Sequence, residues 1–209
     1  MKTLELFCGT KSFSKVAKEY GYETLTLDFD NTFNPDIAKN IMDFYIQDLN
    51  GYKPDIIWAS PPCQKFSVAS LGRNWNKEDM TPKNDDTKKA MQIVLKTVQI
   101  IKDLKPKYFY IENPRAMLRK IGLIPYDYST VTYCQYGFHY MKPTDIWSNN
   151  EEWLKVAKSC KNGMPCHESA PRGSATGTQG LKNPAERGKI PPDLIKEILN
   201  YSREEDNNE

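Results

Sequence analysis

The sequence predicts a single α/β domain whose central sheet is mostly parallel, with helices on both faces. The chain opens with a strand, a glycine turn and a helix. Short apolar runs of strand length recur at 23–27, 55–59 and 107–111, and an amphipathic helix at 87–104 separates the last two. At 209 residues the chain is long enough for one such domain and short for two.

The opening unit indicates a nucleotide-binding fold. Residues 3–7 form the expected first strand, Cys8-Gly9-Thr10 the turn and 12–20 the first helix, and the second strand, 23–27, ends at Asp28. In such folds an acid at the tip of the second strand lies at the carboxyl edge of the sheet, where it hydrogen-bonds ribose hydroxyls. We therefore expect a nucleotide-like ligand beside this turn.

A cysteine follows the strand at 55–59 on a stiff junction, Ser60-Pro61-Pro62-Cys63. The two prolines fix φ and supply no N–H, so the strand must stop there and the backbone around Cys63 has little freedom. A thiol held in this way suits nucleophilic attack, because the reacting sulfur is positioned in advance. The alternative from this segment alone is a buried structural cysteine.

Two segments closely resemble motifs of the cytosine-carbon-5 methyltransferases: SPPCQKFS at 60–67 and ENPR at 112–115. The resemblance runs from Leu4 to Leu199 with the order of motifs preserved. It implies a Rossmann-like, S-adenosylmethionine-dependent methyltransferase fold and methyl transfer to carbon 5 of cytosine in DNA. By resemblance, Cys63 attacks carbon 6 and Glu112 assists at N3 of a base that is flipped out or already single-stranded.

The same resemblance implies S-adenosyl-L-methionine as the cofactor and indicates where it binds. Phe7 and Gly9 match the family's Phe-x-Gly, and Asp28 stands where an acid binds the cofactor ribose. The adenine contact falls on Asn40-Ile41, with Asp43 as the alternative register, and an Asn oxygen can accept from an adenine N–H. The expected cofactor-binding residues are Phe7, Cys8, Gly9, Asp28, Phe29, Asn40, Ile41, Asp43 and Pro61.

The strand motif that follows departs from the family. The stretch from Tyr136-Gly137-Phe138 to Trp147 resembles the family's Tyr-Gly-Val-Pro-Gln-x-Arg-x-Arg strand, but the two arginines fall on Lys142 and Thr144. The second arginine normally donates to O2 of cytosine. Lys142 offers a point charge without the bidentate fork, and we assign it a catalytic role. A reduced rate, a relaxed substrate or another residue in place of the arginine all stay open.

A loop after the nucleophile is the expected nucleic-acid contact. Residues 68–86 lack periodicity, which predicts a structureless active-site loop. The loop carries basic side chains around Trp75, a mixture that can touch phosphates and stack on bases. The expected nucleic-acid-binding residues are Gln64, Lys65, Ser67, Arg73, Arg115 and Thr144.

Three regions are expected along the chain: a catalytic core at 1–150, a short irregular basic segment at 151–187, and a C-terminal helix with an acidic tail at 188–209. Residues 155–189 hold seven Lys or Arg against two acids. The middle segment, of about 40 residues, is far below the roughly 100 of an independent target-recognition domain. A partner subunit that supplies sequence recognition would fill this gap.

Two other functions remain open. The small recognition region favours the same chemistry on RNA, single-stranded DNA or a modified pyrimidine. The presence of Lys142 and Thr144 in place of arginines favours a catalytically weak protein that binds cofactor and nucleic acid.

The five cysteines show no disulfide framework, because their number is odd and their spacing irregular. Cys160-x5-Cys166-His167 suggests zinc, with Cys134 or His139 as a fourth ligand. The spacing matches no recognised zinc motif, so we expect scattered free thiols and no metal.

The chain has no run of about 18 apolar residues and no apolar signal-peptide core at its start. We therefore expect a protein without membrane contact that stays in a reducing cytoplasm, bacterial or that of a virus-infected host, or wherever its DNA lies, and is not secreted.

Overall fold

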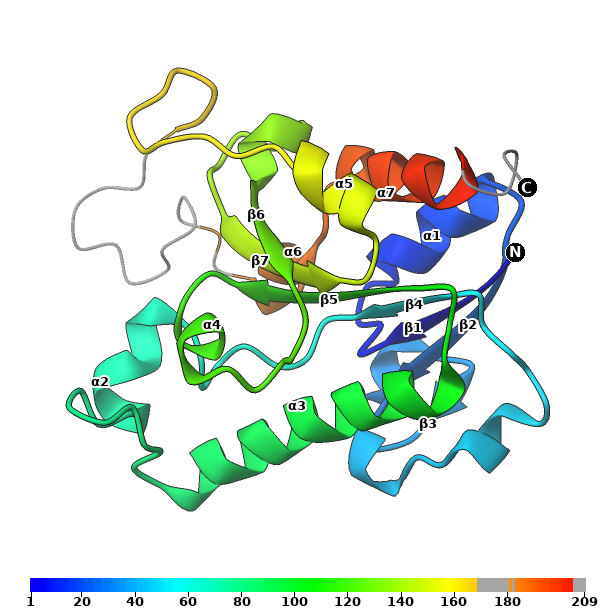
Figure 1. The fold of residues 1–209 in the computed structure, drawn as a ribbon, viewed down its shortest axis with the longest axis horizontal. Coiled ribbons are helices and arrows are strands. Elements are labelled where there is room, and N and C mark those ends of the chain that lie inside the picture. The colour runs from blue at the N-terminus through cyan, green and yellow to red at the C-terminus, as the bar shows by residue number, and fades with distance from the viewer. Residues whose placement is uncertain (169–180, 182, 205–209) are drawn as a thin grey trace.

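The computed structural model describes residues 1–168, 181 and 183–204. A seven-stranded sheet with the order β3-β2-β1-β4-β5-β7-β6 crosses the molecule (Figure 1). Its neighbours pair in parallel except at β7, which is antiparallel to both β5 and β6. The strands are β1 Lys2–Leu6, β2 Glu23–Asp28, β3 Ile37–Ala38, β4 Ile56–Ala59, β5 Tyr108–Pro114, β6 Tyr128–Thr132 and β7 Pro143–Ser148.

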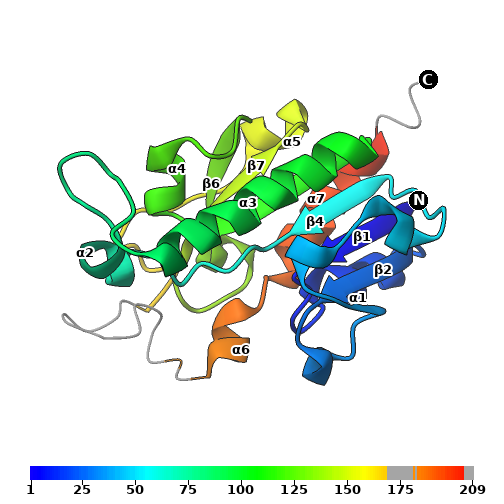
Figure 2. The ribbon, with the colours of Figure 1, turned by 90° about the horizontal axis from the view of Figure 1, so that it is seen from below.

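Helices cover both faces of the sheet, which confirms the predicted fold class (Figures 1 and 2). Helix α3 (Asp85–Leu104) lies on one face, and α1 (Ser12–Glu19), α5 (Glu151–Val156) and α7 (Pro192–Glu204) lie on the other. The shorter helices are α2 (Leu71–Asn74), α4 (Met117–Ile121) and α6 (Pro184–Gly188).

The alternation of side chains along β4 separates two apolar layers. Ile57 packs into the cluster that contains Val94 and Val98 of α3, whereas Trp58 packs into the opposite cluster. Trp58 stacks on Phe13 of α1 with ring centroids 5.3 Å apart. A strand buried on both faces explains why residues 55–59 read as a continuous apolar run.

The predicted helix at 87–104 is confirmed, and its start is set by a cap. Asn84 accepts a hydrogen bond from the Thr87 amide at 2.9 Å, so α3 begins at Asp85. Asn is a favoured N-cap because its side-chain oxygen satisfies an amide left free at the first turn.

The expected structureless loop at 68–86 is wrong, since this segment is ordered by its tryptophan. The segment contains α2, and Trp75 forms a β-bridge with Pro82. Trp75 is 2% exposed, packs on Phe66 with ring centroids 5.9 Å apart, and donates from Nε1 to the Lys65 carbonyl at 2.7 Å. Trp75 therefore anchors the loop and has no exposed ring face to stack on a base.

Residues 151–187 were expected to be irregular, but the segment begins with helix α5 and contains helix α6 near its end. The prediction is therefore wrong at both ends of the segment. Trp153 of α5 is fully buried and meets Tyr110 edge-on, with ring centroids 5.6 Å apart. The apolar core therefore extends to α5. The tail at 205–209 and residues 169–180 lie outside the described residues.

In the part of the chain that the structure describes, every helix is too short or too polar to cross a lipid bilayer.

Replacing Trp153 with alanine tests whether α5 belongs to the core. We expect Trp153→Ala to lower the free energy of unfolding by about 3–5 kcal/mol, the usual cost of truncating a buried Trp. Urea unfolding followed by far-ultraviolet circular dichroism measures the loss. The matched control is Val156→Ala in the same helix, an exposed position where the change should stay within about 0.5 kcal/mol. Equal effects of the two variants would contradict the assignment.

Candidate active site

The register of the sheet brings the separate motifs to one edge. Leu6 of β1 pairs with Leu27 of β2 and with Ala59 of β4, and Ala59 pairs in turn with Ile111 of β5. The four strands are parallel, so the residues after these positions lie at the same edge of the sheet, where β5 alone continues to Pro114 beside β7. The turn after β1, the acid at the end of β2, the proline loop and Glu112 therefore meet at the carboxyl edge, where ligands bind in open α/β sheets.

The proline loop that carries Cys63 is tied to the neighbouring strand. Asn113 of β5 donates from Nδ2 to the Pro61 carbonyl at 2.9 Å. Beyond the prolines, the Cys63 carbonyl accepts from the amides of Phe66 and Ser67, each at 3.0 Å, which closes a tight turn. Cys63 is thus held from both sides and is only partly buried.

Glu112 is 5% exposed and is contacted by two donors. The Tyr133 hydroxyl donates to Glu112 Oε1 at 3.0 Å, and Lys142 Nζ lies 3.8 Å from the same oxygen. Lys142 Nζ also lies over the Tyr133 ring, 4.7 Å from its centroid, and donates to the Arg187 carbonyl at 2.9 Å. This network offsets the cost of burying the carboxylate.

The thiol of Cys63 responds to these charges. Burial raises the pKa of Cys63, and the Glu112 carboxylate raises it further, whereas the positive charges of Lys142 and Arg187 lower it. A thiol, a carboxyl group and two cations therefore lie within electrostatic range of one another. Sequence reasoning found Cys63, Glu112 and Lys142.

Sequence reasoning missed three residues of this site: Asn113, Tyr133 and Arg187. Asn113 stands beside Glu112 in ENPR, so the motif could have indicated it. Tyr133 and Arg187 come from a 3₁₀ turn and from α6, far from the other residues in sequence. We find no local sequence signal that indicates either contact.

The turn after β1 is shaped by left-handed backbone at Phe7 (φ 59°) and Gly9 (φ 44°). The Gly9 amide donates to Asp28 Oδ2 at 2.9 Å and the Asp30 amide donates to Asp28 Oδ1 at 3.0 Å. Each carboxylate oxygen of Asp28 keeps a further lone pair. A Cβ placed on Gly9 would meet nothing within 4 Å, so the space beside the turn is open.

The other expected cofactor residues divide by exposure. Phe29, directly after Asp28, is 71% exposed, and Asn40 and Asp43 are exposed as well. Asn40 Oδ1 already accepts from the Met42 amide at 2.9 Å. The side chains of Cys8 and Ile41 are 4% exposed and belong to the interior, so a cofactor contact at either residue is left to its backbone atoms.

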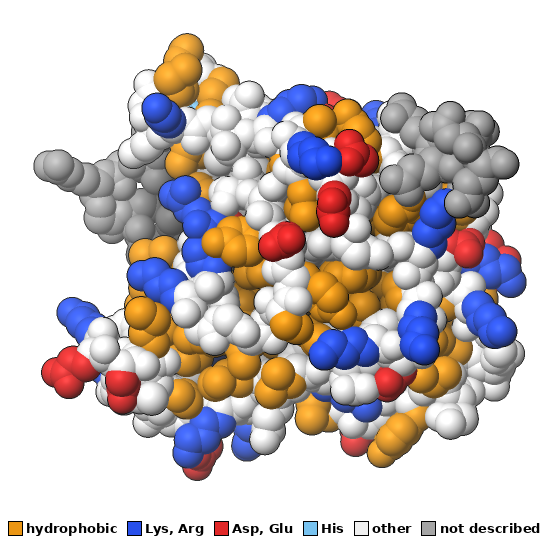
Figure 3. Space-filling model, viewed as in Figure 1, with side chains coloured by type: hydrophobic (Ala, Val, Ile, Leu, Met, Phe, Trp, Pro, Cys, Tyr) orange, Lys and Arg blue, Asp and Glu red, His pale blue; other side chains and the backbone are white. Residues whose placement is uncertain are grey.

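The expected nucleic-acid residues are mostly accessible. Gln64, Arg73 and Arg115 are exposed, and Lys65 is half-buried and paired with Asp86 at 3.4 Å. Ser67 is half-buried. Basic side chains are spread over the face in Figure 3, and several lie at its left, the side toward which the parallel strands point.

Thr144 contradicts the prediction that it binds nucleic acid. It is fully buried, pairs with Pro114 of β5 and Val131 of β6, and donates its hydroxyl to the Lys142 carbonyl at 3.2 Å. Its position inside the sheet leaves no surface for a nucleotide to contact.

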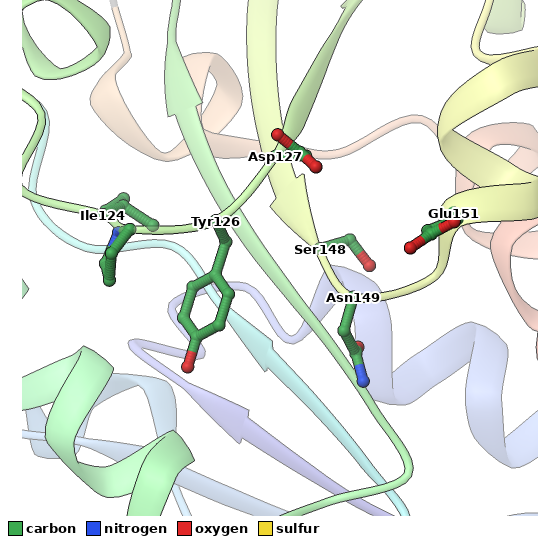
Figure 4. A pocket seen from close by; sticks show the side chains of 7 residues that line it. Ile124, Tyr126, Asp127, Ser148, Asn149 and Glu151 are labelled. Atoms are coloured by element: carbon green, nitrogen blue, oxygen red, sulfur yellow. The ribbon is translucent and has the colours of Figure 1, made fainter.

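A separate shallow pocket lies away from this site, between the loop before β6 and the end of β7 (Figure 4). Its Asn149 accepts from the Phe109 amide at 3.0 Å and donates to the Lys107 carbonyl at 2.8 Å. These bonds hold the start of β5, at the edge of the sheet opposite Glu112. The polar side chain of Asn149 in this pocket is therefore explained by its role in holding the backbone of β5.

The thiols of the C-terminal half are not scattered, so that expectation is wrong. The ligand atoms of Cys134, Cys160, Cys166 and His167 all lie within 4.8 Å of one another. His139, the other fourth ligand considered, lies outside this group.

The comparisons with known proteins identify the family of this chain. Residues 1–122 match the family model described as C-5 cytosine-specific DNA methylase. A protein of Frog virus 3 (isolate Goorha), named as a probable DNA (cytosine-5)-methyltransferase, is 30% identical over 215 residues, which cover 95% of this chain and 99% of that protein.

Two further relatives support the same fold. The type II methyltransferase M.HgiGI of Herpetosiphon aurantiacus is 29% identical over 136 residues, covering 58% of this chain and 97% of that protein. The solved structure of the Entamoeba histolytica methyltransferase EhMeth superposes with a TM-score of 0.52 at 15% identity, over 71% of this chain and 52% of that one.

The charge network around Cys63 predicts how alkylation of this thiol depends on pH. In the free protein the alkylation midpoint should lie above the ordinary cysteine range, because burial and Glu112 disfavour the thiolate. Glu112→Gln should move the midpoint down and Lys142→Met should move it up. Iodoacetamide labelling, with peptide mapping by mass spectrometry to separate Cys63 from the other thiols, measures the midpoint. Shifts of the opposite sign would contradict the network.

Proposed function

The chain belongs to the C-5 cytosine-specific DNA methylase family and is a DNA cytosine-5 methyltransferase, and on this premise we propose how it acts. It transfers a methyl group from S-adenosyl-L-methionine to carbon 5 of cytosine in DNA through a covalent bond between Cys63 and carbon 6. The observation that carries this proposal is the meeting of Cys63, Glu112 and two cations at one sheet edge.

The turn after β1 fits the proposed cofactor. Asp28 has lone pairs left for ribose hydroxyls, and the exposed ring of Phe29 offers an apolar face for a planar base. Asn40 or Asp43 supplies the polar contact to adenine, and the open space at Gly9 admits the ligand beside the backbone. When bound, S-adenosyl-L-methionine supplies an electrophilic methyl group.

Cys63 is the nucleophile. Its thiolate forms a bond to carbon 6 of cytosine, and the electron pair of the C5–C6 double bond moves to carbon 5, which becomes nucleophilic. Lys142 and Arg187 favour the thiolate by their positive charge. After methylation, loss of the carbon 5 proton and elimination of the Cys63 sulfur restore the double bond and the free thiol.

Glu112 acts on N3 of the base. Addition at carbon 6 raises the electron density of the ring, and a proton held between Glu112 and N3 stabilises it. Tyr133 keeps the carboxyl group in place through Oε1, at 3.0 Å, and leaves Oε2 for the base. The target base must leave the helical stack to reach this pocket.

Arg187 offsets the missing arginines of the strand motif. It lies close enough to lower the pKa of Cys63, and its carbonyl accepts the Lys142 ammonium at 2.9 Å. The guanidinium, on α6, thus adds positive charge near the thiol from a different element than the family motif uses. Its role is to stabilise charge that develops on the base during attack.

A partner subunit for sequence recognition has no support in the comparisons.

Trapping the covalent intermediate tests the mechanism. With 5-fluorocytosine DNA and S-adenosyl-L-methionine, the wild-type protein should form an adduct that survives denaturation, because fluorine at carbon 5 blocks the final elimination. Cys63→Ala should form none, and Glu112→Gln should form it far more slowly. Gel electrophoresis under denaturing conditions measures the adduct.

Unsubstituted cytosine DNA is the control, because it should be methylated and released without an adduct. Parallel reactions with labelled methyl donor and either DNA or RNA define the substrate. Label in RNA alone would replace DNA as the substrate, and no label in either would contradict turnover.

Replacing Arg187 tests its proposed part in catalysis. We expect Arg187→Ala to lower kcat by about 10²–10³-fold, the usual loss when one donor to a developing negative charge is removed. Arg187→Lys should recover part of the rate. The control is Lys189→Ala, an exposed cation two residues away that pairs with Glu186. Equal rates for Arg187→Ala and wild type would exclude the role.

A further inference from the structure

Four side chains of the types that bind metals lie close together away from the proposed methyl-transfer site. Cys134 lies in the 3₁₀ turn after β6, whereas Cys160, Cys166 and His167 come from the segment after α5. Their ligand atoms lie within 4.8 Å of one another. The sulfurs and a ring nitrogen therefore face a common centre, although up to 33 positions separate them in sequence, from 134 to 167.

Three of four separations between the ligand atoms fit a tetrahedron around one zinc ion. Zn–S bonds of about 2.3 Å and Zn–N bonds of about 2.0–2.1 Å require edges of about 3.8 Å between sulfurs and about 3.6 Å between sulfur and nitrogen. The Cys134 and Cys166 sulfurs are 3.8 Å apart, and His167 Nδ1 lies 3.5 Å from Cys166 Sγ and 3.6 Å from Cys160 Sγ. The Cys134–Cys160 edge is shorter, at 3.1 Å.

Hydrogen bonds hold the backbone around the four residues in place. The segment after α5 runs beside the end of β6, where the Thr132 amide donates to the Lys158 carbonyl at 3.1 Å and the Cys160 amide donates to Thr132 Oγ1 at 2.8 Å. Further along, the Glu168 amide donates to the His139 carbonyl at 2.8 Å. Hydrogen bonds thus fix the segment on both sides of the cluster.

A neighbouring side chain supports one of the sulfurs. Gln135 Nε2 lies 3.3 Å from Cys166 Sγ and donates to it. Donors to the sulfurs are a usual feature of the surroundings of metal thiolates, because they stabilise the negative charge that the metal shares.

We propose that Cys134, Cys160, Cys166 and His167 bind one zinc ion as a closed structural site. Three thiolates and an imidazole form a donor set typical of zinc, and a complete set of four protein ligands leaves no position for a reacting molecule. The ion joins the segment 157–168 to the turn that holds Tyr133, the neighbour of Cys134 and the donor to Glu112. The site is independent of the methyl-transfer mechanism.

Metal analysis of the purified protein tests the site. The untagged wild-type chain, made in zinc-supplemented medium, should contain one zinc ion per chain by plasma mass spectrometry. Cys166→Ser and His167→Ala should lose it. Cys63→Ala and His139→Ala are matched controls, which remove one cysteine and one histidine outside the cluster and should retain the zinc.

Cobalt substitution gives a second test, whose first result comes from the wild-type protein. Co²⁺ in place of zinc should give the intense visible absorption of a tetrahedral site and a thiolate charge-transfer band, both lost in Cys166→Ser. A chelator should lower the unfolding temperature of wild type but not of Cys166→Ser. Wild-type protein that takes up neither metal, zinc content equal in all four variants, or a Cys134–Cys160 disulfide under non-reducing mass mapping would overturn the proposal.

Discussion

The buried carboxylate of Glu112 is the constraint on which the site depends. A carboxyl group with 5% exposure is costly to bury unless donors and opposite charge surround it. Tyr133 and Lys142 provide them, and both come from the β6–β7 region, which the antiparallel β7 brings against β5. The inserted strand therefore does more than widen the sheet, because it completes the pocket around the acid at the end of β5.

The same arrangement sets a conflict that the cations resolve. Glu112 lies close enough to disfavour the Cys63 thiolate, whereas the proposed mechanism has both groups act on the same base. Lys142, in the turn just before β7, and Arg187 of α6 act against this effect. The family motif would place two arginines on one strand. This chain has Lys142 in that motif and a second positive charge, Arg187, on α6. Positive charge near the thiol is therefore retained although the arginine pattern of the motif is not.

Local signals in the sequence were enough for the elements that build the sheet edge. Apolar strand runs and the double proline before Cys63 each act within a few residues, so their structure could be predicted. The Asn-Pro pair after Glu112 does not end the strand, because β5 continues to Pro114 beside β7. The burial of Trp75 could not be predicted in the same way. The local sequence around an aromatic residue in a polar loop does not distinguish a ring that packs inward from one that faces solvent. Its burial depends on Phe66 and the Lys65 carbonyl, which only the folded chain brings near.

The cysteine cluster shows the same limit at longer range. The spacing from Cys160 to His167 matches no zinc pattern, because the missing ligand, Cys134, belongs to a turn on another part of the fold. The segment that carries three of the ligands is short, and residues 161–166 are exposed, so it buries too little apolar surface to hold its own shape. A metal site supplies stabilisation where no core can form. A zinc site of four residues would thus stabilise this short segment, which is too small to have the packed core of a full recognition domain.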